Sequence, residues 1–287
     1  MVNGGVFMVW EKYKGPVKLV VLDTAGTICD GPQDLRHIWP EDDGLGVKAP
    51  VVPFYETLKK WGVTLDWTTI RKPMGLFKKD HLRALLETPE AKRQFREKHN
   101  RDWNEDDLDE MFEHYKGILN EVIVHPELAK PIPGAVEVIN KLRESGKLIG
   151  NTTGYTKEAS AKLNKLLEKE YGIKFDFAAV PEIVKAGRPY PWMIMKHMEE
   201  LDVYPPLAVV KVGDTKYDIE EGKNAGVWTI GLYATGNNNY EDLASANPDY
   251  LVPSISDILP IIVSDITNLT NVQELLNPLF CKADPLC

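Results

Sequence analysis

Short apolar runs recur along the chain, and each is followed by a polar or glycine-containing turn and then by a segment with helical spacing. The apolar runs are typical of strands, and three of them are almost entirely apolar, as in a parallel sheet covered by helices on both faces. This alternation predicts an α/β fold with a doubly wound, mostly parallel sheet as its core. The expected strands are residues 17–22, 147–150, 175–180, 208–212 and 228–232, and the expected helices are residues 135–144, 156–171, 191–201 and 218–225.

The pattern changes between the first expected strand and the second. Residues 49–128 show helical, strongly charged patterns and no convincing strand, which predicts an inserted helical cap domain. The segments on either side, residues 31–50 and 125–134, are rich in proline, glycine and acids, as hinged linkers are. We therefore divide the chain into a core of residues 16–34 and 130–260, a cap of residues 45–129 and a C-terminal extension of residues 261–287, where we expect a terminal helix and a loose tail.

Composition narrows the class of protein. The 287 residues are 43% hydrophobic and carry a net charge of −9, which predicts a soluble globular protein and argues against a nucleic acid partner. Its three cysteines, Cys29, Cys281 and Cys287, lack the spacing of a zinc site and favour a reducing, cytoplasmic location. The apolar run in the N-terminal segment is too short for a secretory signal, and no later segment approaches the ~20 apolar residues of a membrane span. A small anionic substrate remains compatible with a local basic site.

Carboxylates follow two of the expected strands. Asp23 ends the first strand within the motif DTAGT, and Asp214 follows the fourth, with Asp218 one helical turn further on. The carboxyl ends of parallel strands form the crevice in which ligands bind. Three acids there would repel one another unless a cation lay among them, so they predict a hard, oxygen-preferring metal, most simply Mg²⁺. Each acid alone would fit a strand-to-loop turn or a helix cap equally well.

Two further motifs can bind a phosphoryl group. Thr153, in TTGY, follows the second strand, where a hydroxyl and free backbone N–H groups can hold phosphoryl oxygens. Arg188, in AGRPYPWM, is a permanent cation that can screen negative charge. A threonine N-cap and a solvated arginine are the ordinary alternatives. In this order the four motifs resemble those of the haloacid dehalogenase superfamily, and the resemblance implies that Asp23 attacks phosphorus to give an aspartyl-phosphate.

In that superfamily an acid two residues after the nucleophile protonates the leaving oxygen, but this chain has Ala25 there. General acid catalysis contributes about 10²–10⁴ in rate, so hydrolysis of a phosphate ester should be slow without it. The cap segment TIRKPMGLFKKDHLRAL, residues 69–85, offers another group. Its Lys78 and His81 are three residues apart and share a face of the expected helix. A helix lysine is more often simply solvated.

This cap segment, together with DTAGT, TTGYT and AGRPYPWM, resembles one branch of the superfamily, the phosphonoacetaldehyde hydrolases or phosphonatases. The resemblance implies that Lys78 forms a Schiff base with the substrate aldehyde. It also implies a homodimer formed through the caps, although the C-terminal region diverges from this branch. Two further features depart from the branch: the first linker is longer than is usual, and the pocket cysteine has no clear counterpart. The implied pocket residues are Met74, Gly75 and Tyr155, with His81 moving protons and Thr153 and Arg188 on the phosphate; the implied magnesium ligands are Asp23, the Ala25 carbonyl, Asp214 and Asp218.

The Schiff base would explain why Ala25 suffices. An iminium beside the carbon–phosphorus bond lets carbon leave as an enamine, so no leaving oxygen needs a proton. We expect Lys78 to be partly neutral because Lys72, Lys79 and Arg71 repel its charge and because cap closure buries it. Three alternatives stay open: a generic magnesium-dependent phosphatase, which leaves Ala25 and the Lys78 segment unexplained; a haloacid dehalogenase, which has no use for a metal-binding Asp214; and a non-catalytic relative, in which the other motifs should have decayed.

Overall fold

The structure, a computed structural model, describes residues 13–263. Its strands form one parallel sheet in the order β3-β2-β1-β4-β5-β6, which confirms the doubly wound α/β fold predicted from the sequence. Because the strand order reverses beside β1, the carboxyl ends of the central strands border the crevice in which such sheets bind ligands. The strands are β1 (Leu19–Leu22), β2 (Leu148–Thr152), β3 (Phe177–Ala179), β4 (Val209–Gly213), β5 (Trp228–Leu232) and β6 (Tyr250–Val252).

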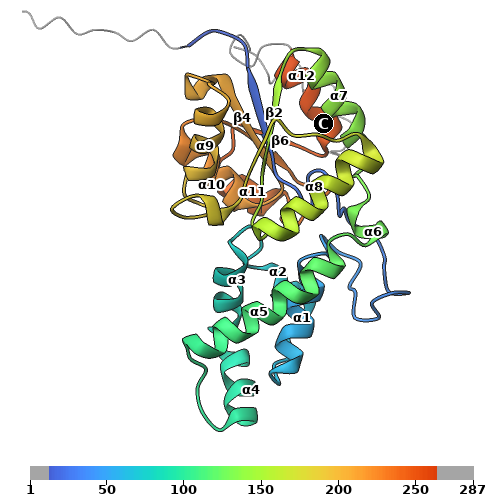
Figure 1. The fold of residues 1–287 in the computed structure, drawn as a ribbon, viewed down its shortest axis with the longest axis vertical. Coiled ribbons are helices and arrows are strands. Elements are labelled where there is room, and N and C mark those ends of the chain that lie inside the picture. The colour runs from blue at the N-terminus through green and yellow to red at the C-terminus, as the bar shows by residue number, and fades with distance from the viewer. Residues whose placement is uncertain (1–12, 264–287) are drawn as a thin grey trace, which may run out of the picture.

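Helices cover both faces of the sheet (Figure 1). Alternate side chains of a strand point to opposite faces, and β1 is buried on both. Val20 and Leu22 belong to the hydrophobic cluster that includes α7 (Ala135–Glu144), α8 (Lys157–Tyr171) and α12 (Ile258–Val263). Leu19 and Val21 belong to a second cluster that includes residues of α9 (Trp192–Glu200) and α10 (Lys216–Ala225). Helix α11 (Tyr240–Ser245) lies between β5 and β6 in the chain.

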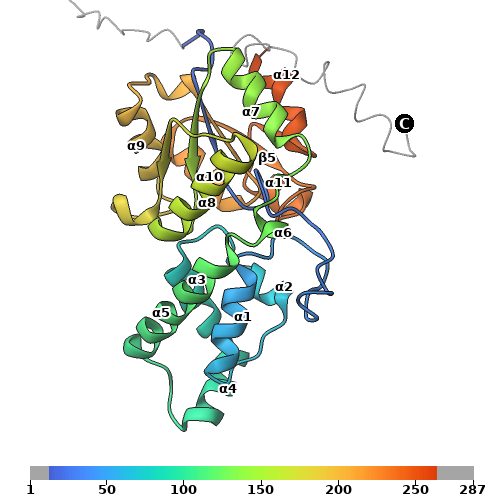
Figure 2. The same ribbon diagram turned by 45° about the vertical axis from the view of Figure 1, so that its right-hand side comes forward.

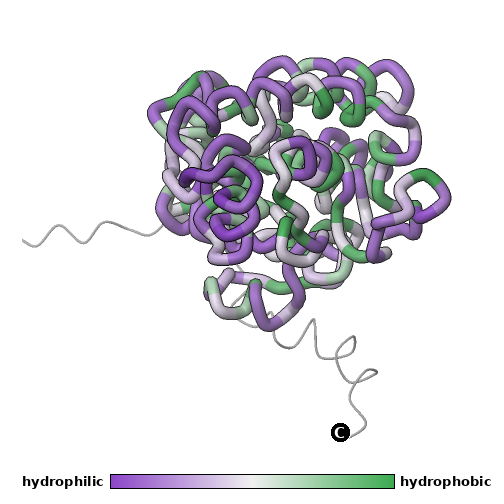
Figure 3. Tube along the Cα trace, turned by 90° about the horizontal axis from the view of Figure 1, so that it is seen from below, coloured by the Kyte–Doolittle hydropathy of each residue, from purple (hydrophilic) through white to green (hydrophobic). Residues whose placement is uncertain are grey.

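The helical insertion forms a lobe beneath the sheet (Figures 1 and 2). Its helices have a buried apolar side and a charged outer side, and hydrophilic stretches dominate the outside of the molecule (Figure 3). We call this lobe the cap; its boundaries at residues 45 and 129 remain a prediction. The helices are α1 (Val51–Lys60), α2 (Trp67–Arg71), α3 (Lys78–Leu86), α4 (Pro89–His99), α5 (Glu105–Val122) and α6 (Pro126–Ala129).

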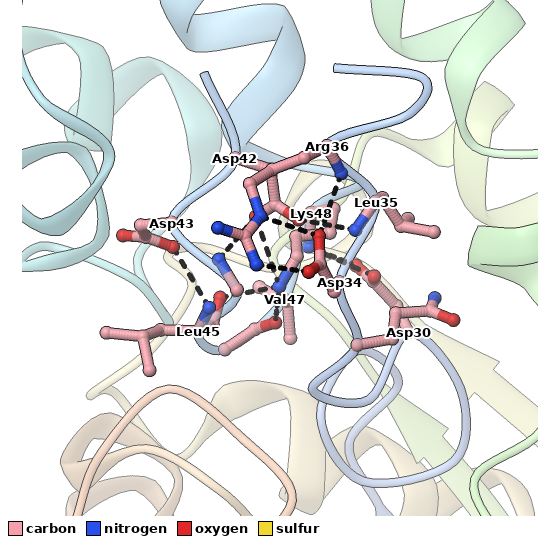
Figure 4. A network of polar contacts seen from close by, with 12 residues as sticks. Asp30, Asp34, Leu35, Arg36, Asp42, Asp43, Leu45, Val47 and Lys48 are labelled. Atoms are coloured by element: carbon pink, nitrogen blue, oxygen red, sulfur yellow. Dashed lines mark hydrogen bonds and ion pairs between the residues drawn. The ribbon is translucent and has the colours of Figure 1, made fainter. Parts of the chain in front are cut away.

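The first linker, residues 31–50, contains no helix or strand but is held by buried polar contacts (Figure 4). The side chain of Lys48 is fully buried, and its Nζ donates to two carbonyl oxygens of the linker at 2.7 Å and lies 3.5 Å from Asp42 Oδ1. At the start of the linker, the carboxylate of Asp30 accepts the backbone N–H groups of residues 48 and 49 at 2.7–3.0 Å. Composition predicted that this segment is a hinged linker. In the structure it is held by hydrogen bonds and an ion pair among its own residues and Asp30.

The ends of the fold differ from expectation in two places. Strand β6 was not predicted from the sequence. The described residues end in α12, which starts at Ile258 and includes residues 261–263 of the predicted extension. The rest of that extension, where a terminal helix and a loose tail were expected, lies outside the described residues, as do Cys281 and Cys287. Within residues 13–263, none of the helices combines the length and apolarity that crossing a bilayer requires.

Candidate active site

A small cavity of about 20 Å³ lies between the core and the cap. Such a volume holds about one water molecule, so a larger ligand requires the cap to move away from the core. Most of the residues singled out in the sequence line this cavity: Asp23, Ala25, Thr153, Tyr155, Arg188 and Asp214 from the core, and Met74, Gly75 and Lys78 from the cap. His81 and Asp218 are not among the lining residues.

Asp23 lies at the carboxyl end of β1 and is almost completely buried. Burial raises the pKa of this carboxyl, and the nearby Arg188 guanidinium, which donates to its Oδ1, opposes the rise. The turn that carries Asp23 is fixed from β2, because Asn151 Nδ2 donates to the Leu22 carbonyl at 3.0 Å and to Thr24 Oγ1 at 2.9 Å. The nucleophile predicted from the sequence therefore lies on rigid backbone.

The three predicted acids form one buried cluster, in which an oxygen of Asp23, of Asp214 and of Asp218 lie within 4.8 Å of one another. Asp214 Oδ2 accepts from the backbone N of Asn237 at 2.7 Å and from its Nδ2 at 2.8 Å, whereas Asp214 Oδ1 has no hydrogen-bond partner. Burial and then the charges of Asp23 and Asp218 raise the pKa of Asp214 well above its usual range. An unpartnered carboxylate oxygen among like charges fits a hard divalent cation such as Mg²⁺.

Asp218 is engaged differently from the other two acids. Its Oδ2 accepts from the backbone N and the Oγ1 of Thr215 at 3.2 and 2.6 Å, so it also caps helix α10. Its Oδ1 lies 3.0 Å from Arg188 NH1 and 2.9 Å from Lys211 Nζ. Burial acts to raise the pKa of Asp218, but these two cations outweigh it and lower the pKa. Within the described residues, neither Asp214 Oδ1 nor Asp218 Oδ1 accepts a hydrogen bond, but Asp218 Oδ1 lies beside two protein cations and Asp214 Oδ1 does not.

Thr153 occupies the turn after β2 and is buried against the cavity. Its Oγ1 accepts from the backbone N of Tyr155 at 3.2 Å. The N-cap of α8 is Thr156, three residues after Thr153, so Thr153 does not have the capping role considered from the sequence. The Thr153 hydroxyl keeps its own hydrogen to donate, as a phosphate-binding hydroxyl requires.

Lys78 is the first residue of α3 and is only 4% exposed. Its Nζ lies 3.6 Å from Met74 Sδ and 5.3 Å from the centre of the Tyr155 ring. Burial lowers the pKa of Lys78 to about 8, with Asp23 opposing the shift and Arg188 adding to it. The cap lysine is therefore a partly neutral amine at neutral to mildly basic pH.

Burial, the largest cause of this lowered pKa, was expected from the sequence, but the charged neighbours that act on Lys78 are not the expected ones. Lys79 forms an ion pair with Asp109, and Arg71 forms one with Asp43, so both of these cations are neutralised by acids of the cap and its linker. The cation that acts on Lys78 is Arg188, from the core. The neutral amine thus depends on burial between the two lobes rather than on the run of basic residues around it.

Two glycines allow the cap to rest against the core. Gly75 has φ of +102°, and a Cβ there would lie 2.6 Å from Thr215 Oγ1, at the start of α10. A Cβ at Gly154 would lie 2.5 Å from the Leu76 carbonyl oxygen. These close approaches bring the cap segment around Gly75 directly over the turns that carry Asp214 and Thr153.

His81 lies beside Lys78 but is enclosed within the cap. Its Nε2 is 2.7 Å from the Ile70 carbonyl oxygen and therefore donates to it, and its ring lies 4.0 Å from that of Phe54. Burial and then the charge of Lys78 lower the pKa of His81 well below its usual range. The ring is neutral, its Nδ1 has no hydrogen-bond partner, and the proton transfer expected of it stays a prediction.

Several residues at the site were not singled out in the sequence. Asn237, Pro50 and Thr215 line the cavity, and Lys211 and Glu221 are fully buried beneath it. Lys211 leaves a recognisable signal, because it is a charged residue inside the otherwise apolar run VVKV. Glu221 leaves a weaker one, since it lies three residues after Asp218 on the same helix face. Asn237 and Pro50 reach the site through loops, and no pattern marks them.

The chain is similar to known proteins of one hydrolase family. A family model described as haloacid dehalogenase-like hydrolase matches residues 17–226. A phosphonoacetaldehyde hydrolase from Bacillus cereus strain G9842 is 42% identical over 219 residues, which is 75% of each chain, and one from Bacillus mycoides is 41% identical over 216 residues, again 75% of each.

Two solved structures are also similar. The crystal structure of a phosphonoacetaldehyde hydrolase-like protein from Oleispira antarctica has a TM-score of 0.78 at 28% identity and covers 94% of this chain and 97% of its own. A predicted phosphoglycolate phosphatase from Haemophilus somnus, at 18% identity and a TM-score of 0.64 over 85% of this chain and 97% of its own, shares the fold alone.

Proposed function

The chain belongs to the haloacid dehalogenase-like hydrolases and, among them, to the phosphonoacetaldehyde hydrolases, and from this premise we propose that it hydrolyses phosphonoacetaldehyde to acetaldehyde and phosphate. The observation that carries the proposal is the buried cavity shared by Lys78 and Asp23, in which Ala25 stands where an ester hydrolase needs an acid. An amine and a carboxylate are the two nucleophiles that cleavage of a carbon–phosphorus bond beside an aldehyde requires.

In the first stage, the neutral amine of Lys78 attacks the aldehyde carbon, and loss of water gives an iminium. Its pKa of about 8 supports this step, because an appreciable fraction of the amine is unprotonated near neutral pH. The iminium carbon is joined to the CH₂ group that carries phosphorus. When the carbon–phosphorus bond breaks, its electron pair can therefore form a C=C bond between these two carbons, which gives an enamine.

In the second stage, an oxygen of Asp23 attacks phosphorus, the carbon–phosphorus bond breaks, and its electron pair forms the enamine. Water then hydrolyses the aspartyl-phosphate to phosphate and Asp23, while protonation of the enamine and hydrolysis of the imine release acetaldehyde and Lys78. The sum is one water consumed for each substrate. Ala25 suffices because the leaving atom is carbon, so no leaving oxygen has to be protonated.

Magnesium held by Asp23, Asp214 and the Ala25 carbonyl would supply positive charge that lets the phosphoryl oxygens approach the carboxylates. Arg188 and Thr153 are the protein groups best located to bind those oxygens, since both line the cavity beside Asp23. Tyr155 and Met74 flank the Lys78 amine and would hold the aldehyde end of the substrate.

The same family relationship supports two wider proposals, a cytoplasmic location and a homodimer formed through the caps. Sedimentation of the purified full chain should give twice the mass of one chain, and a monomer at micromolar concentration would refute the dimer.

The leading alternative is a generic magnesium-dependent phosphatase with this fold. Purified protein given phosphonoacetaldehyde and Mg²⁺ should release acetaldehyde and phosphate in equal amounts, and Asp23→Asn should release neither. Phosphate monoesters should turn over at least 100-fold less efficiently, because Ala25 cannot donate a proton to an ester oxygen. Faster phosphate release from any ester in a panel of sugar, glycolyl and aryl phosphates would favour the alternative and reject the proposal.

A further inference from the structure

The guanidinium of Arg188 is enclosed by acids on all of its edges, and only 2% of the side chain is exposed. Its NH2 donates to Asp23 and, at 3.1 Å, to Thr152 Oγ1. Its NH1 lies 3.0 Å from Asp218 Oδ1, and its Nε lies 3.3 Å from Glu221 Oε2. Each nitrogen thus faces a different partner, and only the NH2 edge points at the nucleophile.

Glu221 contacts the Nε side of the Arg188 guanidinium and does not line the cavity. Its side chain is fully buried, and within the described residues its ion-pair partners are Arg188 and Lys211, each at 3.3 Å. Neither of its oxygens accepts a well-aligned hydrogen bond. Burying a carboxylate costs several kcal/mol, and ion pairs without good hydrogen bonds repay this cost poorly. Stability alone therefore gives Glu221 little reason to be charged.

Lys211 joins Glu221 to the phosphate-binding turn. It lies within β4, is fully buried, and its Nζ lies 2.9 Å from Asp218 Oδ1 and 3.3 Å from Glu221 Oε2. The same ammonium donates to Thr152 Oγ1, the residue before Thr153 and a second partner of Arg188. One cation therefore links two of the three acids of α10, Asp218 and Glu221, to the end of β2.

We propose that Glu221 and Lys211 are positioning residues that aim Arg188 at the phosphoryl group. A bound phosphoryl oxygen must compete with Asp23 for the NH2 edge of the guanidinium, and Asp23 must be released to attack. The guanidinium stays in place during this exchange only if its other nitrogens are held. Ion pairs hold them: NH1 lies 3.0 Å from Asp218 Oδ1, and Nε, which makes no hydrogen bond with the described residues, lies 3.3 Å from Glu221 Oε2. Lys211 balances the charge of both acids and sets their distance from Thr152. The inference rests on the phosphate-binding part of the proposed function and not on the Schiff base.

A purely structural role makes a different prediction. If Glu221 only supported the packing of α10 against β4, its replacement would lower the melting temperature and leave oxyanion affinity unchanged in the folded protein. If it positions Arg188, its effect on oxyanion affinity must depend on Arg188. A double-mutant cycle between the two residues distinguishes these cases.

The experiment measures the dissociation constant of orthovanadate, a phosphoryl mimic, by calorimetry of the full chain with Mg²⁺. Glu221→Gln keeps the shape and removes the charge, and it should weaken binding about 10- to 100-fold, as expected when a binding group is displaced by around 1 Å. In an Arg188→Lys background the same substitution should change affinity less than 3-fold. The matched control is Glu220→Gln, a neighbouring acid outside the cluster, which should change nothing.

An equal loss in both backgrounds, or unchanged affinity in folded Glu221→Gln protein, would overturn the inference. If Glu221→Gln fails to fold, Glu221→Asp keeps the charge but shortens its reach, and it should give an intermediate loss that also disappears with Arg188→Lys. Because orthovanadate binding involves no carbon–phosphorus bond, this test can succeed while the proposed substrate is wrong. It can equally fail while phosphonoacetaldehyde is hydrolysed, so the two claims are separable.

Discussion

Lys78 of the cap and Asp23 of the core line the same small cavity, although they come from different lobes of the molecule. Lys78 owes its lowered pKa first to burial between those lobes. The position of the cap against the core therefore places the amine beside the carboxylate and lowers the pKa of the amine, as the proposed attack on an aldehyde requires. The pairing is consistent with a reaction that needs both nucleophiles on one substrate.

The pH dependence of turnover should report Lys78. Below a pKa of about 8 the amine is protonated and cannot attack a carbonyl, so kcat/KM for phosphonoacetaldehyde should rise with pH and level off above that value. A bound cation would repel the ammonium and move the midpoint lower. Lys79→Gln should leave the midpoint unchanged, because Lys79 pairs with Asp109. A profile that is flat or falls between pH 6 and 9 would contradict the assignment of Lys78.

Magnesium should stabilise the protein in a pH-dependent way. The pKa of Asp214 is raised in the folded state, so its contribution to stability is present in acid and is lost as the pH rises through the folded pKa. A cation relieves this repulsion, so the increase in Tm with Mg²⁺ should be larger at pH 8 than at pH 5. Asp214→Asn should weaken magnesium binding at least 10-fold by calorimetry, whereas Asp106→Asn, at an exposed position, should not. Full activity after exhaustive chelation would reject the site.

The sequence predicts those site residues whose polar side chain directly follows a recognisable strand. Asp23, Thr153 and Asp214 each follow a strand directly, so one strand pattern and one polar residue were enough to locate them. The roles of Lys211 and Glu221 could not be predicted, because they depend on how β4, α10 and the loop of Arg188 meet in space. The lowered pKa of Lys78 was predicted, but the cation that contributes to it, Arg188, was not, because its position near Lys78 also depends on how the two lobes meet in space.

The close contact at Gly75 should be needed for activity. With φ of +102° and Thr215 Oγ1 2.6 Å from the position of a Cβ, Gly75→Ala strains the backbone and pushes the cap away from the core. We expect kcat/KM to fall at least 10-fold, because reacting groups displaced by about 1 Å lose this much. Gly117→Ala is the matched control: it lies in helix α5 with open space around its Cβ and should raise stability by up to about 1 kcal/mol. Equal activity of both variants would exclude a role for this contact.

Lys48 should be important for stability. Lys48→Met removes the buried ammonium and leaves two carbonyl oxygens and Asp42 without their partner, which should lower the free energy of unfolding by about 2–4 kcal/mol. Lys59→Met is the comparison, because Lys59 is half exposed and only 4.0 Å from Glu41, and it should change stability by less than about 0.5 kcal/mol. Urea denaturation of both variants measures the difference, and similar midpoints would show that the linker does not need its internal cation.

The central claim is a covalent bond between Lys78 and the substrate aldehyde, and borohydride trapping tests it most directly. Borohydride added during turnover should reduce the iminium to a secondary amine, inactivate the enzyme irreversibly and leave an adduct that peptide mass spectrometry assigns to Lys78. Borohydride without substrate should leave activity intact. Lys78→Arg should give no adduct, since a guanidinium stays protonated, and Lys79→Arg should be trapped like the unmodified protein. Sustained turnover of phosphonoacetaldehyde with no inactivation and no adduct on Lys78 would contradict the account.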